Sequence, residues 1–378
     1  MDEQAAGPLY LASSECKGLA EWLVAHRRKG PVVVVTAAST GLADQVAIVD
    51  PLVAEAMNSG RETVRLDLRS DPAPVLGVAG AVLMPGGDPF RLLRELRASG
   101  AAAVIARRHA EGLAVAGQSA GAMVCGPTLL PVTLTSPFTP EPAQDLAGLG
   151  LTATLALPHH DRTGRAARHR QAAVRFGASV NLAPLWDGEV LQQDSTGCSV
   201  HEGALVMRPA RVSDAAAIDA VFRAATQAAW ASFLGGDRLR ATVPDTDRWR
   251  TRIQQADGWF LVAEDAEGVL GFVFSRRAED ADLDPQTVGE LDLLYTLPRA
   301  WGAGIGRRLL DRATFALLAA GYREAVLWTE ARNERALAVY RRNGWIQDGT
   351  FKDRDYLGVP IRNLRHRFDL RSLAGGGR

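Results

Sequence analysis

The sequence has 378 residues, 47% of them hydrophobic, and its 43 basic side chains balance its 43 acidic ones. A neutral chain lacks bulk attraction to nucleic acid or anionic membranes, and three scattered cysteines suit neither a disulfide framework nor a cysteine-rich zinc site. No apolar run approaches the length of a membrane-spanning helix, about 18 residues. The first residues are acidic and lack the basic region with which a signal peptide begins. We therefore expect a cytoplasmic protein of two domains, with no metal and no nucleic-acid or membrane partner.

Short buried strands alternate with helices through the first half of the chain. Apolar runs at 32–35, 79–84 and 112–116 adjoin Gly or Pro turn signals, residues 62–68 alternate in polarity, and residues 44–57 and 89–99 have helical spacing. This order predicts βαβ units, which build a mostly parallel sheet between helices. Residues 127–150 are rich in Pro, Thr and Gly and predict a long loop.

The second half predicts an α+β domain with a hairpin-rich sheet. Strands are expected at 206–210, 259–264, 269–275, 291–296 and 325–329, and helices at 213–233, 304–320 and 334–342. The change of pattern predicts one domain over 1–204, a second over 205–372, and a flexible Gly-rich tail over 373–378.

The first candidate site is the segment Gly117-Gln118-Ser119-Ala120-Gly121. The pattern G-x-S-x-G between a strand and a helix is typical of a nucleophile elbow, where small neighbours let a tight turn expose the serine hydroxyl. The backbone N–H of Ala120 would then face the oxygen that becomes negative during acyl transfer. In a chain rich in Gly, Ala and Ser the bare pattern can arise without function, so the prediction depends on the strand–turn–helix context.

The wider segment resembles the dipeptidase E and cyanophycinase group of serine peptidases, family S51, whose fold is similar to that of class I glutamine amidotransferases. The resemblance rests on Pro85-Gly86-Gly87-Asp88, on Gln118-Ser119-Ala120-Gly121-Ala122, and on Leu157-Pro158-His159-His160-Asp161 at the end of an expected strand, 153–157. It implies a flavodoxin-like sheet sandwiched by helices, with Ser119 as nucleophile and His159 as base. The N–H groups of Gly87 and Ala120 are implied as the oxyanion hole. His160 is the alternative base, and the two histidines could instead be a structural pair.

The third member of a catalytic triad is left open by this resemblance. Relatives carry an acidic residue about midway between the serine and the histidine, whereas residues 134–137 contain no carboxylate. Glu141 and Asp145 follow shortly afterwards and are the candidates, with exposed loop charges as the alternative interpretation. A Ser–His dyad, another amide substrate and a degenerate site also stay open, so the family's preference for aspartyl peptides is not transferred.

The second candidate site is the segment Arg299-Ala300-Trp301-Gly302-Ala303-Gly304-Ile305-Gly306-Arg307, between an expected strand and an expected helix. Glycines let backbone N–H groups approach a pyrophosphate closely, at the positive end of a helix dipole. Neither the Lys-Ser/Thr pair of a P-loop nor the acidic residue of a dinucleotide-binding unit follows. By itself, the segment therefore only suggests a phosphate site.

Residues 206–370 resemble a GNAT-family N-acetyltransferase nearly end to end. The resemblance rests on Met207–Ala210 with Ser213-Asp214, on Glu290–Pro298 followed by R-x-x-G-x-G, and on Asn333, Tyr340 and Asn343-Gly344-Trp345. It implies acetyl-CoA as the co-substrate, with its pyrophosphate bound by Arg299, Gly302, Ala303, Gly304, Ile305, Gly306 and Arg307. Its pantetheine arm is implied along Leu294, Tyr295 and Thr296 and near Asn333.

The same resemblance implies two catalytic side chains in this half. Tyr340 takes the position of the acid that protonates the departing thiolate, and Glu290 that of the base acting on the acceptor amine. Packing is the alternative for Tyr340, and a strand-end charge is the alternative for Glu290. Trp230, Trp249, Trp259 and Trp328 are candidates for the acceptor pocket, with core packing as the favoured interpretation for most of them.

Together the two resemblances predict a fused bifunctional enzyme, an amide or peptide hydrolase followed by an N-acetyltransferase. The expected substrate is a small-molecule or peptide-like amine or amide, and detoxification of one compound by both halves is a hypothesis. The alternative is an acetyltransferase whose first domain only binds or scaffolds, and a further alternative is a GNAT half that only senses acetyl-CoA. A homodimer is compatible with the sequence.

Overall fold

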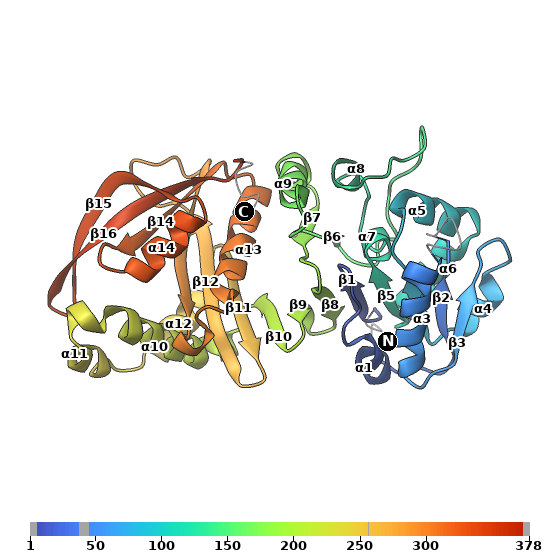
Figure 1. Cartoon of the computed structure of the whole chain (residues 1–378), viewed down its shortest axis with the longest axis horizontal. Helices are drawn as coiled ribbons and strands as arrows, with labels where there is room; N and C mark the ends of the chain where they lie inside the picture. Colours follow the sequence, from blue (N-terminus) through green and yellow to red (C-terminus); the bar gives the residue numbers. More distant parts are fainter. Residues whose placement is uncertain (1–5, 38–44, 256, 373–378) are drawn as a thin grey trace. The chain divides into compact units, whose positions relative to one another are not determined.

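The computed structural model describes residues 6–37, 45–255 and 257–372, so the tail predicted at 373–378 lies outside the described residues. The chain separates into two compact units, Met1–Gly203 and Ala204–Arg378 (Figure 1). Within the described ranges, no helix combines the length and the apolar character needed to cross a bilayer.

The first unit alternates strands and helices along the chain. Its elements are β1 (Leu9–Ala12), α1 (Leu19–Ala25), β2 (Val32–Val35), the π-helical turn η1 (Gln45–Val49), α3 (Asp50–Asn58), β3 (Thr63–Leu66), α4 (Ala73–Val78), β4 (Ala81–Met84), α5 (Pro89–Ala98), α6 (Ala101–Ala110), β5 (Ala114–Gln118), α7 (Ala120–Val124), α8 (Val132–Thr135), β6 (Thr154–Leu157), α9 (Arg165–Phe176), β7 (Asn181–Pro184), β8 (Val190–Asp194) and β9 (Gly197–Glu202).

The main sheet of this unit has the order β3-β2-β4-β5-β1-β8-β9, and β6 and β7 form a separate parallel pair. The strands from β3 to β1 are all parallel, whereas β8 runs antiparallel to β1 and β9 antiparallel to β8. One face, which includes Leu83, packs on helices α1 and α3. The other face carries α7, whose Gly121 lies against Met84, the next residue of β4. Helices on both faces of a mostly parallel sheet confirm the fold class predicted for this half.

Several features of this unit differ from the sequence prediction. The helix expected over 44–57 is divided into η1 and α3, because Pro51 in the first turn of α3 has no N–H to continue the preceding turn. Its first expected residue, Asp44, lies outside the described residues. The loop expected over 127–150 contains the short helix α8. Strand β1, which the sequence patterns did not predict, is fully buried between β5 and β8.

The second unit begins with a strand and a long helix and continues as a strongly antiparallel sheet. Its elements are β10 (Leu205–Pro209), η2 (Val212–Asp214), α10 (Ala215–Leu234), α11 (Gly236–Arg240), α12 (Thr246–Gln254), β11 (Trp259–Asp265), β12 (Gly268–Arg277), β13 (Val288–Thr296), η3 (Pro298–Ala300), α13 (Ile305–Ala319), β14 (Glu324–Glu330), α14 (Glu334–Arg342), β15 (Ile346–Tyr356) and β16 (Val359–Asp369).

The sheet of the second unit has the order β10-β11-β12-β13-β14-β16-β15, with β13 and β14 as its parallel pair. That pairing covers only Val288–Leu291 of β13, so the rest of the strand has β12 as its partner and its other edge is unpaired among the described residues. A bulge at Asp292 accompanies the change, since Phe274 opposes Leu293 while Ser275 opposes Leu291. The α+β class predicted for this half is confirmed.

Candidate active sites

Ser119 lies on a strained turn between β5 and α7. Its backbone has φ 49° and ψ −104°, a conformation that non-glycine residues rarely adopt and that is typical of functional sites. The glycines on either side make the turn feasible. A Cβ on Gly117 would lie 2.4 Å from the Gly121 carbonyl, and one on Gly121 would lie 2.0 Å from the Met84 carbonyl oxygen. The pattern G-x-S-x-G is therefore required by close backbone packing as well as by the exposure of the serine.

A continuous hydrogen-bonded chain joins Ser119, His159 and Asp187. Ser119 Oγ lies 3.0 Å from His159 Nε2, and His159 Nδ1 lies 2.6 Å from Asp187 Oδ1. Burial lowers the pKa of His159, Arg162 lowers it further, and the bond to Asp187 opposes them without cancelling the shift. The imidazole is therefore neutral near pH 7 and able to accept the serine proton.

The carboxylates expected as the third triad member do not contact His159. Glu141 is ion-paired with Arg94, and Asp145 lies 2.8 Å from Arg97. Both are exposed loop residues tied to helix α5, so the prediction of Glu141 or Asp145 is wrong. The carboxylate on the histidine comes instead from Asp187, which follows β7.

Neighbouring groups fix the position of Asp187 and His159. Arg162 Nε donates to Asp187 Oδ2 at 2.5 Å. Burial raises the pKa of Asp187, but hydrogen bonds from Arg162 and His159 outweigh it and hold the pKa below its usual value. The buried Ser13 hydroxyl accepts the His159 backbone N–H at 2.8 Å and lies 3.3 Å from Asp187 Oδ1. His159 itself has φ 64°, so its backbone is held in the left-handed region.

His160, the alternative base, contacts a second histidine. Its Nδ1 lies 2.9 Å from Nδ1 of the buried His169 on α9, and the two rings stack with centroids 5.2 Å apart. His159 and His160 therefore have different surroundings, and it is His159 that contacts Ser119.

The backbone amides expected to form an oxyanion hole lie around the same turn. Met84 of β4 pairs with Gly117 of β5, which brings the 85–88 segment beside Ser119. A Cβ on Gly86 would lie 3.4 Å from the Ser119 Cβ. Gly87 has φ 130°, and Ala120 is the first residue of α7, where an N–H has no partner within its own helix. Neither amide donates to an acceptor among the described residues.

In the second unit, the free edge of β13 and the Gly-rich loop adjoin. Leu294, Tyr295 and Thr296 pair with β12 only, and η3 leads from them to the loop. Gly302 and Gly304 have φ 85° and 81°, and Gly304 is the N-cap of α13, so Ile305, Gly306 and Arg307 form its first turn. The amino-terminal end of a helix beside a strand edge that pairs with no other described strand fits an extended ligand that carries a pyrophosphate.

Two of the expected cofactor-binding side chains have partners within the chain. Arg299 pairs with Asp265 at 3.1 Å and with Glu267 at 3.4 Å, both at the β11–β12 hairpin. Asn333 caps α14 by accepting the Ala336 N–H at 3.3 Å. Ala303 N–H is 3.4 Å from the Ala300 carbonyl, which closes the loop on itself.

Tyr340 is buried and Glu290 is half-buried, and the pKa of each is shifted. Burial and then the nearby Asp292 raise the pKa of Glu290 to about 7, and Arg276, 3.6 Å away, opposes the shift. Burial raises the pKa of Tyr340, so its hydroxyl stays protonated at neutral pH. The Tyr340 ring lies against Trp345 and His366, with centroids 6.2 and 6.4 Å away.

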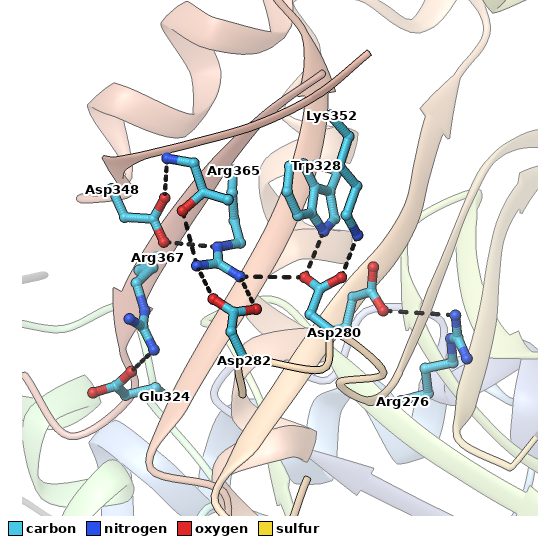
Figure 2. A network of polar contacts seen from close by, with 11 residues as sticks. Arg276, Asp280, Asp282, Glu324, Trp328, Asp348, Lys352, Arg365 and Arg367 are labelled. Atoms are coloured by element: carbon cyan, nitrogen blue, oxygen red, sulfur yellow. Dashed lines mark hydrogen bonds and ion pairs between the residues drawn. The ribbon is translucent and has the colours of Figure 1, made fainter. Parts of the chain in front are cut away.

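A polar network covers the same face of the sheet as Glu290 (Figure 2). Asp280 is its centre: it accepts the Trp328 indole N–H at 3.0 Å, contacts Arg365 at 3.5 Å, and is ion-paired with Lys352. Arg365 also pairs with Asp282 and Asp348, each at 2.7 Å. Trp328 is thus held by polar contacts, whereas Trp249 is fully buried in the core. Trp230 packs on Tyr356, and Trp259 is partly exposed.

Asp187 and Ser13 are the site residues that sequence reasoning missed. Asp187 lies three residues after the end of β7, and an acidic residue shortly after a strand was the available signal. Ser13 follows β1, which the sequence patterns also missed.

Comparison with known families agrees with the two folds. Residues 53–200 match peptidase family S51, and residues 223–345 match the acetyltransferase (GNAT) family. Solved structures similar to this chain include a protein assigned as peptidase E from Listeria monocytogenes EGD-e, with 20% identity, coverage of 52% of this chain and 99% of that chain, and a TM-score of 0.45. Another is yncA of Salmonella typhimurium, assigned as an acetyltransferase and solved with its cofactor acetyl-CoA, with 22% identity, coverage of 46% and 99%, and a TM-score of 0.36.

Curated relatives of this chain include two mycothiol acetyltransferases. The protein from Geodermatophilus obscurus is 31% identical over 29% of this chain and 38% of its own length. That from Beutenbergia cavernae is 34% identical over 25% of this chain and 32% of its own length. This chain thus spans well under half of these relatives. The chain thus has a region that matches peptidase family S51, followed by a region that matches the acetyltransferase (GNAT) family.

Proposed function

We propose that the protein is a bifunctional enzyme that hydrolyses an amide in its first unit and acetylates an amine in its second. The observation that carries the hydrolase is the unbroken chain from Ser119 Oγ through His159 to Asp187, with distances of 3.0 and 2.6 Å. The alternative of a non-catalytic scaffold rested on the absence of an acid from the expected loop, and Asp187 removes that support.

In the hydrolase, His159 Nε2 takes the proton of Ser119 as Oγ attacks the substrate carbonyl carbon. Asp187 accepts from Nδ1–H and stabilises the imidazolium that forms. The N–H groups of Gly87 and Ala120 would hold the carbonyl oxygen as it becomes negative, where one such donor contributes about 3 kcal/mol. The imidazolium then protonates the departing amine, and a water molecule releases the acyl group by the same steps in reverse.

In the acetyltransferase, the co-substrate acetyl-CoA supplies the activated acetyl group. The free edge of Leu294–Thr296 would pair with its pantetheine arm, and the amides around Gly304 would bind its pyrophosphate. Glu290, with a pKa of about 7, would take the proton of the acceptor ammonium directly or through water. Tyr340 would donate its phenolic proton to the leaving thiolate.

The proposed substrate is a small compound with an amine and an amide, such as a peptide-like or aminoacylated molecule. Both chemistries act at the same kind of bond, since hydrolysis exposes an amine and acetylation caps one. Removal of a toxic compound of this class is the proposed role. The mycothiol acetyltransferases among the relatives are consistent with a small amine-bearing acceptor.

Two separate measurements test this proposal on the full chain. Covalent labelling of Ser119 by a fluorophosphonate, absent in Ser119→Ala, is expected for an active hydrolase. Release of free thiol from acetyl-CoA, measured with a panel of amines and aminoacylated compounds, is expected to require both the amine and Glu290. Folded protein that the fluorophosphonate does not label would refute the proposed hydrolase. Tight binding of acetyl-CoA without turnover of any compound in the panel would favour a second unit that only senses acetyl-CoA.

A further inference from the structure

A basic pocket lies at the amino-terminal ends of strands β2 and β3. Its volume is about 400 Å³, within the usual range of small-molecule sites. The lining residues carry one acidic and four basic side chains and are Arg27, Arg28, Lys29, Gly30, Gly60, Arg61 and Glu62. The pocket is therefore strongly positive, although the whole chain is neutral.

Arg61 is built into this pocket as a buried cation. It is only 8% exposed, and its Nη2 donates to the carbonyl oxygens of Arg28 at 2.9 Å and Gly30 at 3.0 Å. Its Nη1 is buried without a partner in the described ranges. A Cβ on Gly80 would lie 2.1 Å from Arg61 Nη2, so the adjacent backbone leaves just enough room for the guanidinium.

Among the described residues this guanidinium donates to carbonyl oxygens and pairs with no carboxylate, although Glu62 also lines the pocket. Buried charges in proteins are normally paired, because removing an ion from water costs several kcal/mol. Burial lowers the pKa of Arg61, and the neighbouring Arg27 lowers it further. An anion in the pocket would supply the missing charge.

The other three cations are available to the same ligand. Arg27, Arg28 and Lys29 are exposed and form no ion pair among the described residues. Arg28 reaches only a carbonyl, that of Glu111, at 2.7 Å. Four positive groups around one hollow suit an anion with several adjacent charges, since guanidinium groups bind phosphate oxygens in pairs.

We propose that this pocket binds a small anion with at least two adjacent phosphate groups. The pocket is separate from the hydrolase site. It lies where β2 and β3 begin, whereas Ser119 follows the end of β5, and the strands between them are parallel and in register. About four residues of strand, on the order of 13 Å, separate the two edges of the sheet. The ligand is thus an effector or an anchor rather than a substrate of Ser119.

Calorimetric titration of the full chain with inorganic pyrophosphate tests this proposal. Each titration is run with and without saturating coenzyme A, which would occupy the phosphate site proposed around Gly304 but also carries adjacent phosphates that can compete for this pocket. The readout is therefore the binding that the pocket variant weakens in the absence of coenzyme A. The test variant is Arg27→Glu/Lys29→Glu, and the control is Lys17→Glu/Arg69→Glu, which makes the same change of charge at residues that are 62% and 90% exposed and lie outside the pocket. Thermal unfolding verifies that both variants are folded.

We expect saturable binding of one pyrophosphate, a dissociation constant at least ten-fold higher in the test variant, and less than a two-fold change in the control. Arg61→Met is expected to abolish binding. If Arg61→Met does not fold, the variant Arg27→Glu/Lys29→Glu, which changes only exposed residues, still tests the proposal. Orthophosphate is expected to bind at least ten-fold more weakly than pyrophosphate. Absence of saturable binding, an equal loss in test and control variants, or equal affinity for both anions would overturn the proposal.

Discussion

Replacement of Asp187 by asparagine tests the triad most directly, because the structure determines which way the amide would face. Arg162 Nε–H lies 2.5 Å from Oδ2 and requires an acceptor there, so the amide oxygen of Asp187→Asn would face Arg162. The NH2 group would then face His159 Nδ1, which is 2.6 Å from Oδ1. A donor at that position stabilises the tautomer with its proton on Nε2, and this tautomer cannot accept the proton of Ser119.

The expected loss is large. Forcing the wrong tautomer in a serine triad lowers the rate by about 10⁴, equivalent to about 5 kcal/mol of transition-state stabilisation. The assay is the second-order rate of fluorophosphonate labelling at Ser119, which needs no knowledge of the natural substrate. We expect Asp187→Asn to reduce this rate by on the order of 10³ to 10⁴ while thermal unfolding stays cooperative.

Matched variants separate this explanation from a general loss of structure. Glu141→Gln and Asp145→Asn remove carboxylates that pair with helix α5, so labelling within two-fold of wild type is expected. Adding Arg162→Ala to Asp187→Asn frees the amide to turn its oxygen to His159, and partial recovery of labelling is expected. A folded Asp187→Asn protein that labels at the wild-type rate would refute the reasoning.

Three further results are expected. Because the pKa of His159 is lowered, mainly by burial, the labelling rate should fall only below about pH 6.5, the usual value of the base, and a midpoint above 7 would contradict this. The rate of acetyl transfer should rise through about pH 7 as Glu290 loses its proton, and Glu290→Gln should remove that rise from the kcat/KM profile, while an unchanged profile would exclude Glu290 as the base. Gly121→Ala places a Cβ 2.0 Å from the Met84 carbonyl oxygen and should lower the free energy of unfolding, measured in urea, by at least about 2 kcal/mol. Gly77→Ala, in α4 with open space around it, should leave the free energy of unfolding unchanged or raise it. Equal effects of the two substitutions would argue against the close packing of the turn.

The strong local patterns in this chain predicted the elements that carry both motifs. Strand β5, the turn at Ser119 and helix α7 follow from an apolar run that ends in glycine and small residues. Strand β13, the Gly-rich loop and helix α13 were likewise expected, with end differences of a few residues. Strand β1 was missed although it has the same length as the predicted β2 and likewise follows a Gly-Pro pair. Its residues Leu-Tyr-Leu-Ala include no β-branched side chain, whereas β2 consists of four valines, so the strand signal of β1 is weaker.

Long-range pairings could not be predicted in the same way. Asp187 and His159 are brought together because the parallel strands β6 and β7 end side by side, and only strand pairing specifies this. The two loop acids that were expected to contact the histidine instead form ion pairs with arginines on α5. The raised pKa of Glu290 similarly depends on burial and on Asp292 at a bulge that no local pattern announces.

The two fold classes, the serine on its turn, the later Pro-His pair and the Gly-rich loop could all be predicted from local patterns, because each pattern has its own steric or hydrogen-bonding reason. The acid that contacts the histidine, and the one of two adjacent histidines that contacts Ser119, became known only from the folded chain. Folding also gathers charge locally in a neutral chain: Arg61 is far from Ser119, yet it is buried beside three other cations and has no ion-pair partner among the described residues. The net charge of a sequence does not show which charged side chains the fold places close together. Hydrogen-bond partners that are distant in the chain depend on which strands pair.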